Sequence, residues 1–129
     1  MINSTYSKKT LELFRNPKNM GEMKNPDAVG TKGNPSCGDI LKVYLKIKNN
    51  KITDIKFQTF GCAAAIASSS MLTILTKGKT IKQAKKITNN DVAIALGKLP
   101  PIKIHCSNLA ADALKKAIED YEKIRPSNR

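Results

Sequence analysis

The stretch that decides the fold runs from residue 37 to residue 62 and reads CGDILKVYLKIKNNKITDIKFQTFGC. Its first half alternates apolar and polar side chains, as a strand with one buried face does, with the apolar set at Leu41, Val43, Leu45 and Ile47. Asn49-Asn50 predicts a tight turn, and Ile55 and Phe57 resume the alternation on the way back. The stretch therefore predicts an antiparallel β-hairpin.

The two ends of this hairpin carry side chains that can bind metals. Cys37 and Asp39 precede the first strand and Cys62 follows the second, so antiparallel pairing would bring them to the same end of the sheet. The third cysteine, Cys106, directly follows the only histidine, His105. Thiolates with one oxygen or nitrogen ligand suit zinc or an iron-sulfur cluster, and we expect a sulfur-rich site if the fold gathers these residues.

Two other roles for the cysteines are weaker. A free cysteine is commonly a small buried hydrophobe, but Cys37 and Cys106 stand among polar residues and glycine, and only Cys62 leads into an apolar run. A cysteine hydrolase is disfavoured because the only histidine adjoins Cys106, and neighbouring residues on a helix point in different directions. Three cysteines cannot all pair within one chain, which favours thiols or ligands over disulfides.

Outside the hairpin the sequence predicts loops and helices. The residues up to Ser36 predict a helix from about Thr5 to Arg15 and then a loop over 16–36, with one short edge strand around Val29. Further helices are predicted for 63–76, from a capping box at Thr80 through Ile87, from Asn90-Asp91 to Gly97, and from about His105 to Ile124. Cys62 and Cys106 would then stand at helix starts, where the helix dipole lowers the pKa of a thiol, and Lys103 would add positive potential near Cys106.

Composition bounds the class of protein. A chain of 129 residues with 40% hydrophobic content predicts one compact domain over 1–129, with flexible ends at 1–4 and 125–129. No apolar run of membrane-span length and no signal core is present, which predicts a cytoplasmic protein without a membrane partner. The net charge is +13, but the lysines are spread along the chain without arginine clusters or interleaved aromatics. This pattern favours a solvated surface that attracts an acidic partner over a nucleic-acid site.

Several segments, in order and at matching separations, resemble IscU/NifU-type iron-sulfur cluster assembly scaffolds. They are Asn16-Pro17-Lys18-Asn19-Met20-Gly21, Gly33-Asn34-Pro35-Ser36-Cys37-Gly38-Asp39, residues 61–70 (GCAAAIASSS), Lys77-Gly78-Lys79-Thr80, Leu99-Pro100-Pro101-Ile102-Lys103 and His105-Cys106-Ser107. The resemblance implies an α+β fold, a three-stranded antiparallel sheet with helices packed on it. It also implies a scaffold and carrier protein rather than an enzyme.

The resemblance further implies a cargo, a site and partners. A [2Fe-2S] cluster would be built from iron and from sulfur supplied by a cysteine desulfurase, and then passed to apo-acceptor proteins. Its ligands would come from Cys37, Asp39, Cys62, His105 and Cys106, with either Asp39 or His105 as the ligand that is not a thiolate. Cys106, and after it Cys62, is the predicted sulfur acceptor. Leu99, Pro100, Pro101, Ile102 and Lys103 would dock a DnaK-class chaperone that works with a co-chaperone.

Two points stay open from the sequence. The same ligands also satisfy a tetrahedral zinc site, so a zinc-binding sulfur acceptor is the alternative function, and zinc is an alternative occupant of the cluster-free scaffold. A monomer and a small homo-oligomer are both compatible with the sequence.

Overall fold

The predicted hairpin forms the centre of the structure, a computed structural model that describes residues 8–34, 39–60, 63–97 and 109–124. Strands β2 (Asp39–Lys48) and β3 (Lys51–Phe60) pair antiparallel from Ile40 opposite Phe60 to Lys48 opposite Lys51. Asn49 and Asn50 have φ values of 54° and 62°, the left-handed conformation that a two-residue hairpin turn requires. The hairpin and its turn are confirmed.

A third strand completes the antiparallel sheet, whose order is β1-β2-β3. The sequence predicts only a short edge strand around Val29, but β1 (Ala28–Asn34) pairs with β2 over its whole length, from Ala28 opposite Leu45 to Asn34 opposite Asp39. The glycines of β1 lower its intrinsic strand propensity, but its hydrogen bonds to β2 stabilise the strand despite this low propensity. The expected fold class, α+β with a three-stranded antiparallel sheet, is confirmed.

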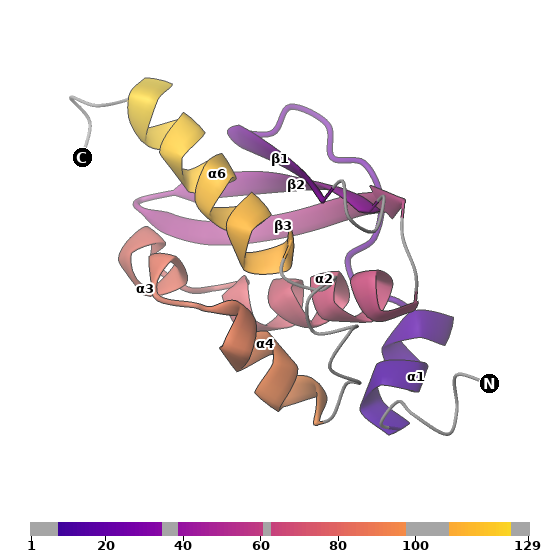
Figure 1. Ribbon diagram of the computed structural model, residues 1–129. Helices are drawn as coiled ribbons and strands as arrows, with labels where there is room; N and C mark the ends of the chain where they lie inside the picture. Colours follow the sequence, from indigo (N-terminus) through magenta and orange to yellow (C-terminus); the bar gives the residue numbers. More distant parts are fainter. Residues whose placement is uncertain (1–7, 35–38, 61–62, 98–108, 125–129) are drawn as a thin grey trace.

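The helices follow the sequence pattern closely. They are α1 (Lys8–Arg15), α2 (Ala63–Thr76), α3 (Ile81–Lys85), α4 (Asn89–Leu96) and α6 (Leu109–Ile124) (Figure 1). Capping boxes at Thr80 and Thr88 begin α3 and α4, so α4 starts one residue before the predicted Asn90. Helix α3 ends before the predicted Ile87 because Lys86 is already its C-cap. No helix in the described ranges is both long and apolar enough to span a membrane.

The core lies between the sheet and two helices, α6 against β1 and β2 and α2 against β3. Its largest fully buried side chains include Phe57, Leu41, Leu45, Leu72, Leu114 and Ile118. Gly30 lets α6 approach β1 closely, since a Cβ added there would lie 2.4 Å from both the Ala113 carbonyl oxygen and the Ala117 amide nitrogen. This contact fixes the helix that follows residues 98–108 directly onto the sheet.

The segment after α1 is tied to the rest of the fold on two sides, and we call residues 18–21 the strap. On one side the Lys18 amide donates to Ser70 Oγ at 2.7 Å, and the Asn19 side-chain amide donates to Thr73 Oγ1 at 3.0 Å. On the other side Gly21 N–H donates to the Phe57 carbonyl at 2.7 Å, and Phe57 N–H donates to the Asn19 carbonyl at 3.1 Å. The strap thus lies along the free edge of β3 and joins it to the polar side chains of α2.

The sheet face that points away from the helices is only partly open. Tyr44, in the polar row of the predicted hairpin, is only 4% exposed. The neighbouring outward residue Lys46 donates to the carbonyl of Asn25, which lies between the strap and β1. The alternation within β2 does not predict that Tyr44 is buried.

Candidate functional site

The predicted ligands fall largely outside the described residues. Cys37, Cys62, His105 and Cys106 all lie there, as does the predicted chaperone-docking segment 99–103 with Leu99, Pro100, Pro101, Ile102 and Lys103. The predicted flexible ends, 1–4 and 125–129, lie there too. Asp39 is described through its backbone, as the first residue of β2, opposite Asn34. These residues therefore stay predictions, and the described residues beside them define where the candidate site can be.

The described ends of the chain beside Cys37 and Cys62 lie at one end of the sheet. The pair Asn34 and Asp39 closes the β1–β2 ladder, and the pair Ile40 and Phe60 closes the β2–β3 ladder. Helix α2 begins at Ala63, soon after Phe60. The hairpin register thus bears out the geometric step of the sequence argument, that residues flanking Cys37 and Cys62 meet at one end.

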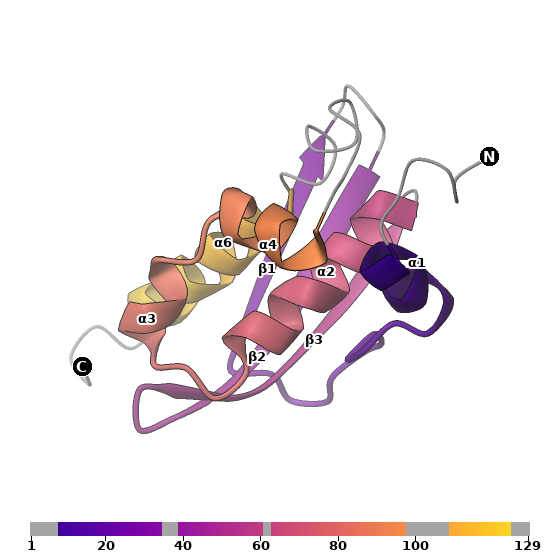
Figure 2. The ribbon, with the colours of Figure 1, turned by 90° about the horizontal axis from the view of Figure 1, so that it is seen from below.

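Helix α6 points its first turn toward the same end. Its contact with Gly30 of β1 fixes its position, and Figures 1 and 2 both show its N-terminal, orange end nearer to the end of the sheet where Asn34, Asp39 and Phe60 lie. Cys106 precedes Leu109, the first residue of α6, by three positions. The flanks of Cys37 and Cys62 therefore lie at one end of the sheet, and α6, which follows Cys106, begins on the side nearer to that end.

Within the described ranges, no group of three or more histidine, cysteine, aspartate or glutamate side chains could hold a metal ion. All cysteines and the only histidine lie in the segments outside those ranges.

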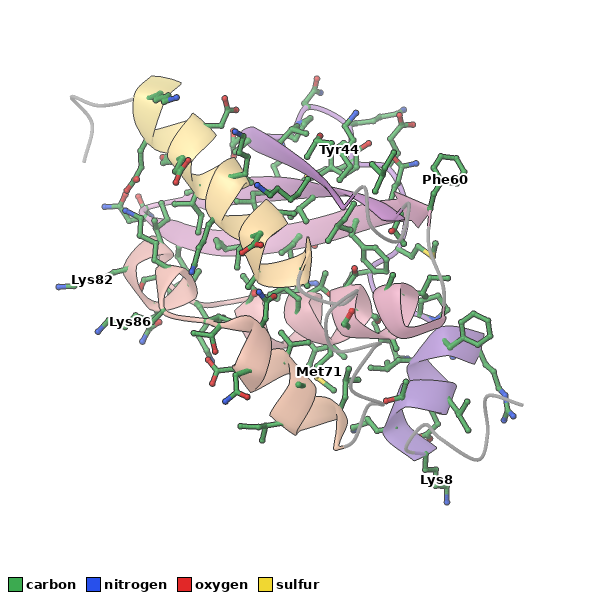
Figure 3. All side chains as sticks on the ribbon, in the orientation of Figure 1. Lys8, Tyr44, Phe60, Met71, Lys82 and Lys86 are labelled. Carbon is green, nitrogen blue, oxygen red and sulfur yellow. The ribbon has the colours of Figure 1, made fainter. Side chains whose placement is uncertain are left out.

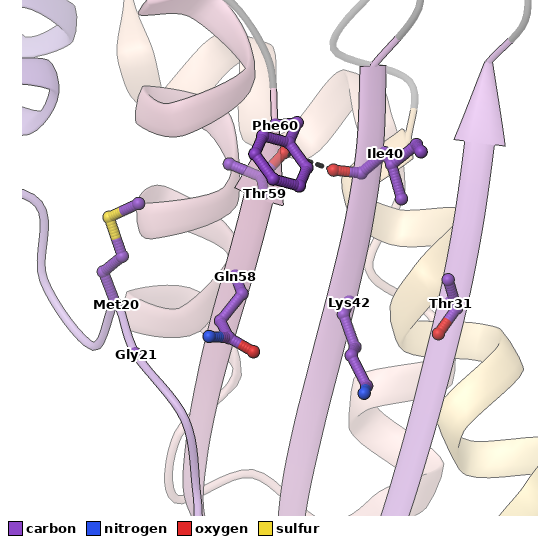
Figure 4. Close-up of a pocket in the computed structure, with 8 residues that line it drawn as sticks. All are labelled: Met20, Gly21, Thr31, Ile40, Lys42, Gln58, Thr59 and Phe60. Carbon is purple, nitrogen blue, oxygen red and sulfur yellow. Dashed lines mark hydrogen bonds between the residues drawn. The ribbon is translucent and has the colours of Figure 1, made fainter.

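A hollow of about 390 Å³ lies on the outward face beside this end. Figure 4 looks onto that face and shows Phe60 and Ile40 at its upper rim and Met20 of the strap at its side. These apolar side chains are unusually exposed, Phe60 at 81%, Ile40 at 48% and Met20 at 41%. Exposed apolar side chains that gather beside a candidate site are typical of a protein-protein contact surface.

Polar side chains also line the hollow, those of Thr31, Lys42, Gln58 and Thr59. Tyr44 donates its phenolic hydrogen to Gln58 Oε1, and the Lys42 ammonium lies 5.4 Å from the centre of the Tyr44 ring. Thr59 Oγ1 donates to the Ile40 carbonyl at 2.6 Å, which ties the two strand ends together beside the apolar rim. The hollow thus combines an apolar rim with polar lining residues that include one lysine.

The sequence analysis missed this hollow, although part of its signal was present. Ile40 and Phe60 occupy outward positions of the alternating hairpin, where polar residues are expected, and they face each other across the ladder. Two apolar residues at solvent-facing positions of one hairpin end indicate a contact surface. Met20 could not be found in this way, because only the strap brings it to the edge of β3.

Comparisons with known proteins agree with this arrangement. Residues 5–128 match the family model described as NifU-like N terminal domain. Iron-sulfur cluster assembly scaffold protein IscU 1 of Archaeoglobus fulgidus is 62% identical over 116 residues, which cover 90% of this chain and 76% of that protein. The IscU scaffold protein of Rickettsia prowazekii is 47% identical over 128 residues, covering 96% of this chain and 97% of the relative.

Solved structures extend the likeness to the fold. The N-terminal part of a NifU-like protein from Brucella abortus aligns with a TM-score of 0.72 at 27% identity, covering 95% of this chain and 97% of that one. A putative iron-sulfur cluster assembly scaffold for the SUF system from Fervidobacterium islandicum aligns at 0.68 and 25% identity, covering 88% and 96%. With its sheet, its helices and nearly its whole length matched, this chain belongs to the family of NifU-like N-terminal domains, together with the IscU iron-sulfur cluster assembly scaffolds.

Proposed function

We propose that this chain, as a single domain, assembles a labile [2Fe-2S] cluster from iron and desulfurase-derived sulfur and transfers it to apo-acceptor proteins in the cytoplasm. The ligands are Cys37, Cys62 and Cys106, with Asp39 or His105 in the remaining position. The observation that carries the proposal is that the described residues flanking Cys37 and Cys62 meet at one end of the sheet, in a chain 62% identical to an IscU scaffold.

The ligand set explains why the cluster is cargo rather than a permanent group. Thiolates are soft ligands that hold iron-sulfur clusters well, whereas a carboxylate or imidazole in the remaining position binds the iron less strongly. A site of this composition can assemble a cluster and also release it. Zinc fits the same tetrahedral ligand set and would occupy the site when no cluster is present.

Sulfur delivery and cluster release require partner proteins. The thiolate of Cys106, or else of Cys62, attacks the outer sulfur of the desulfurase persulfide, so that the sulfur moves to the scaffold and the desulfurase thiolate leaves. The segment 99–103 is proposed to dock a DnaK-class chaperone, since its double proline favours an extended conformation. The chain itself carries out no turnover of a small-molecule substrate in this proposal.

Anaerobic reconstitution tests the function. Purified protein incubated with ferrous iron, cysteine, a cysteine desulfurase and a dithiol reductant, which supplies the electrons that turn persulfide sulfur into sulfide, is expected to develop the visible absorption of a [2Fe-2S] cluster. After apo-ferredoxin is added and the two proteins are separated, the absorption is expected in the ferredoxin fraction. A protein that accepts persulfide sulfur and binds zinc, but never develops this absorption, would instead be the zinc-binding sulfur acceptor. The same sample treated without the desulfurase, but with zinc, serves as the spectroscopic blank.

The apolar rim of the hollow offers a second test, directed at sulfur delivery. A desulfurase must bring its persulfide to the end of the sheet that Ile40 and Phe60 close, so we expect it to cover part of this rim. Phe60→Ser should weaken desulfurase binding about tenfold, because truncating a central aromatic contact costs roughly 1–2 kcal/mol. Isothermal titration with the desulfurase of the same organism measures the change.

Ile94→Ser is the matched control for Phe60→Ser. Ile94 is also largely exposed, at 67%, but it lies on α4 and not on the outward face of the sheet. Helix α4 packs against α2 and α6. Both substitutions should leave the free energy of unfolding within about 0.5 kcal/mol of the original, since neither side chain is buried. Equal desulfurase affinity for both variants and the unchanged protein would remove the rim from the docking surface.

A further inference from the structure

Positive charge gathers at the end of the molecule opposite the candidate site. This end is formed by the hairpin turn, by the turn between α2 and α3, and by α3 itself. Figure 3 shows Lys82 and Lys86 here, with Phe60 at the far end. We call the exposed lysines of these segments the basic pole: Lys48, Lys51, Lys77, Lys79, Lys82, Lys85 and Lys86.

Backbone hydrogen bonds hold these segments together. Ile52 N–H donates to the Lys79 carbonyl and Gly78 N–H donates to the Ile52 carbonyl, both at 2.8 Å. Ile81 N–H, at the start of α3, donates to the Asn50 carbonyl in the hairpin turn at 2.9 Å. Lysines up to 38 positions apart, from 48 to 86, are thereby fixed on one ordered surface.

The charge of the basic pole is only partly balanced within the protein. Lys77 lies 3.5 Å from Asp54 and Lys85 lies 2.5 Å from Glu122, and all four side chains are at least a quarter exposed. Such exposed pairs neutralise charge but contribute little stability. The other lysines of the pole show no ion pair with any described residue, and clustered like charges raise the local positive potential. An anionic partner would lower this repulsion.

A recess of about 220 Å³ lies within the basic pole. Lys82 and Lys85 line it together with the polar Asn50 and Thr80, and Ile81 and Glu122 complete the lining. A recess that combines ammonium groups with amide, hydroxyl and aliphatic surface can hold a carboxylate side chain together with its own methylene groups. Polypeptide, rather than a bare anion, matches this mixture.

We propose that the basic pole docks an acidic segment of a partner protein. The pole contains no arginine and no aromatic side chain, the residue types that nucleic-acid sites use for bidentate phosphate contacts and base stacking. A partner bound here leaves the hollow and the cysteine-flanked end of the sheet accessible at the opposite end. The inference does not depend on the cluster function, because none of its residues belongs to that site.

Charge reversal tests the proposal against a control of equal net charge. The pole variant carries Lys79→Glu, Lys82→Glu and Lys86→Glu. The control carries Lys8→Glu, Lys9→Glu and Lys18→Glu, which are exposed on α1 and the strap, at the other end of the molecule. Each variant lowers the net charge from +13 by three changes of two units, to +7.

The probe is a fluorescein-labelled glutamate-rich peptide, titrated with the full-length chain at low ionic strength and followed by fluorescence anisotropy. The pole variant should weaken binding about tenfold or more, and the control less than about threefold, because exposed charge contacts add a few tenths to one kcal/mol each. Amide NMR shifts during titration of the unsubstituted chain should change at residues 48–52, 77–80 and 81–86. Circular dichroism verifies that both variants are folded.

Equal weakening in the two variants would show that net charge alone attracts the peptide and would overturn the proposal. It would equally be overturned if a uridine oligonucleotide bound more tightly than the peptide and depended on the same lysines, because the pole would then be a nucleic-acid site. Shift changes confined to α1 and the strap would contradict it even if one variant failed to fold.

Discussion

Replacing any one of Cys37, Cys62 and Cys106 with serine is expected to remove most of the [2Fe-2S] absorption after anaerobic reconstitution. Each cysteine supplies one of the thiolates in the proposed ligand set, and a serine hydroxyl is neither soft nor ionised at neutral pH. The remaining ligands are too few to hold a cluster through gel filtration. Visible absorption and bound iron, both measured per chain after desalting, report the loss.

Ser36→Ala and Ser107→Ala serve as controls for the cysteine variants, since each changes a residue next to a cysteine in the sequence without removing a ligand. Both should keep nearly full absorption and iron. Unchanged spectra in all three cysteine variants would contradict the assigned ligand set. Loss in only one or two of them would reduce that set to those cysteines.

Gly30→Ala is expected to destabilise the fold strongly, although it adds only one methyl group. The new Cβ would meet the backbone of α6 at 2.4 Å, at both Ala113 and Ala117, and backbone atoms cannot rotate away as a flexible side chain can. The helix would have to move off β1, which should cost about 3 kcal/mol, at the upper end for overpacking a core. Urea unfolding followed by circular dichroism measures this cost.

Thr31→Ala controls for the effect of altering β1 itself. Thr31 neighbours Gly30 in the strand but is exposed on the outward face, so its loss should cost less than about 1 kcal/mol. Gly30→Ala should also lower cluster yield under conditions where it is still folded, because α6 directly follows the segment that contains His105 and Cys106. Equal urea midpoints for the two variants would contradict the close packing of α6 on β1.

The sequence predicted those parts of the fold whose determinants are local. Helix α2 matches its predicted bounds, Ala63 to Thr76, and the capping box at Thr80 is present in both of its hydrogen bonds. The hairpin was equally predictable, because its alternation and its Asn49-Asn50 turn lie within one short stretch. Each of these signals is read from residues close together in the chain.

What the sequence could not predict depends on contacts between distant segments. The strap reaches Ser70 and Thr73 across more than fifty residues, and Gly30 meets α6 more than eighty residues later. The length of β1 depends on distant contacts in the same way. Its hydrogen bonds to β2 extend the strand over glycines that do not themselves favour a strand. Hydrophobic period and turn residues carry no information about which distant surfaces will meet.

The candidate site likewise has a part that the sequence predicts and a part that it does not. Antiparallel pairing was enough to place the flanks of Cys37 and Cys62 at one end of the sheet, and the register bears this out. The approach of α6 to that end could not be derived from periodicity, since it rests on the close contact at Gly30. The identities of the ligands came from side-chain chemistry and the family resemblance, and they stay predictions.

The strap also bears on how much of the β3 edge is open to other chains. Strand β3 would otherwise present an unpaired edge, and such edges recruit strands from other chains into aggregates. On that edge the Phe57 amide donates to Asn19 and the Phe57 carbonyl accepts from Gly21. The side chains of Ser70 and Thr73 bind the other side of the strap. The strap thus occupies part of the edge that β3 would otherwise expose, and we expect shortened versions that begin beyond residue 21 to form oligomers through β3 more readily.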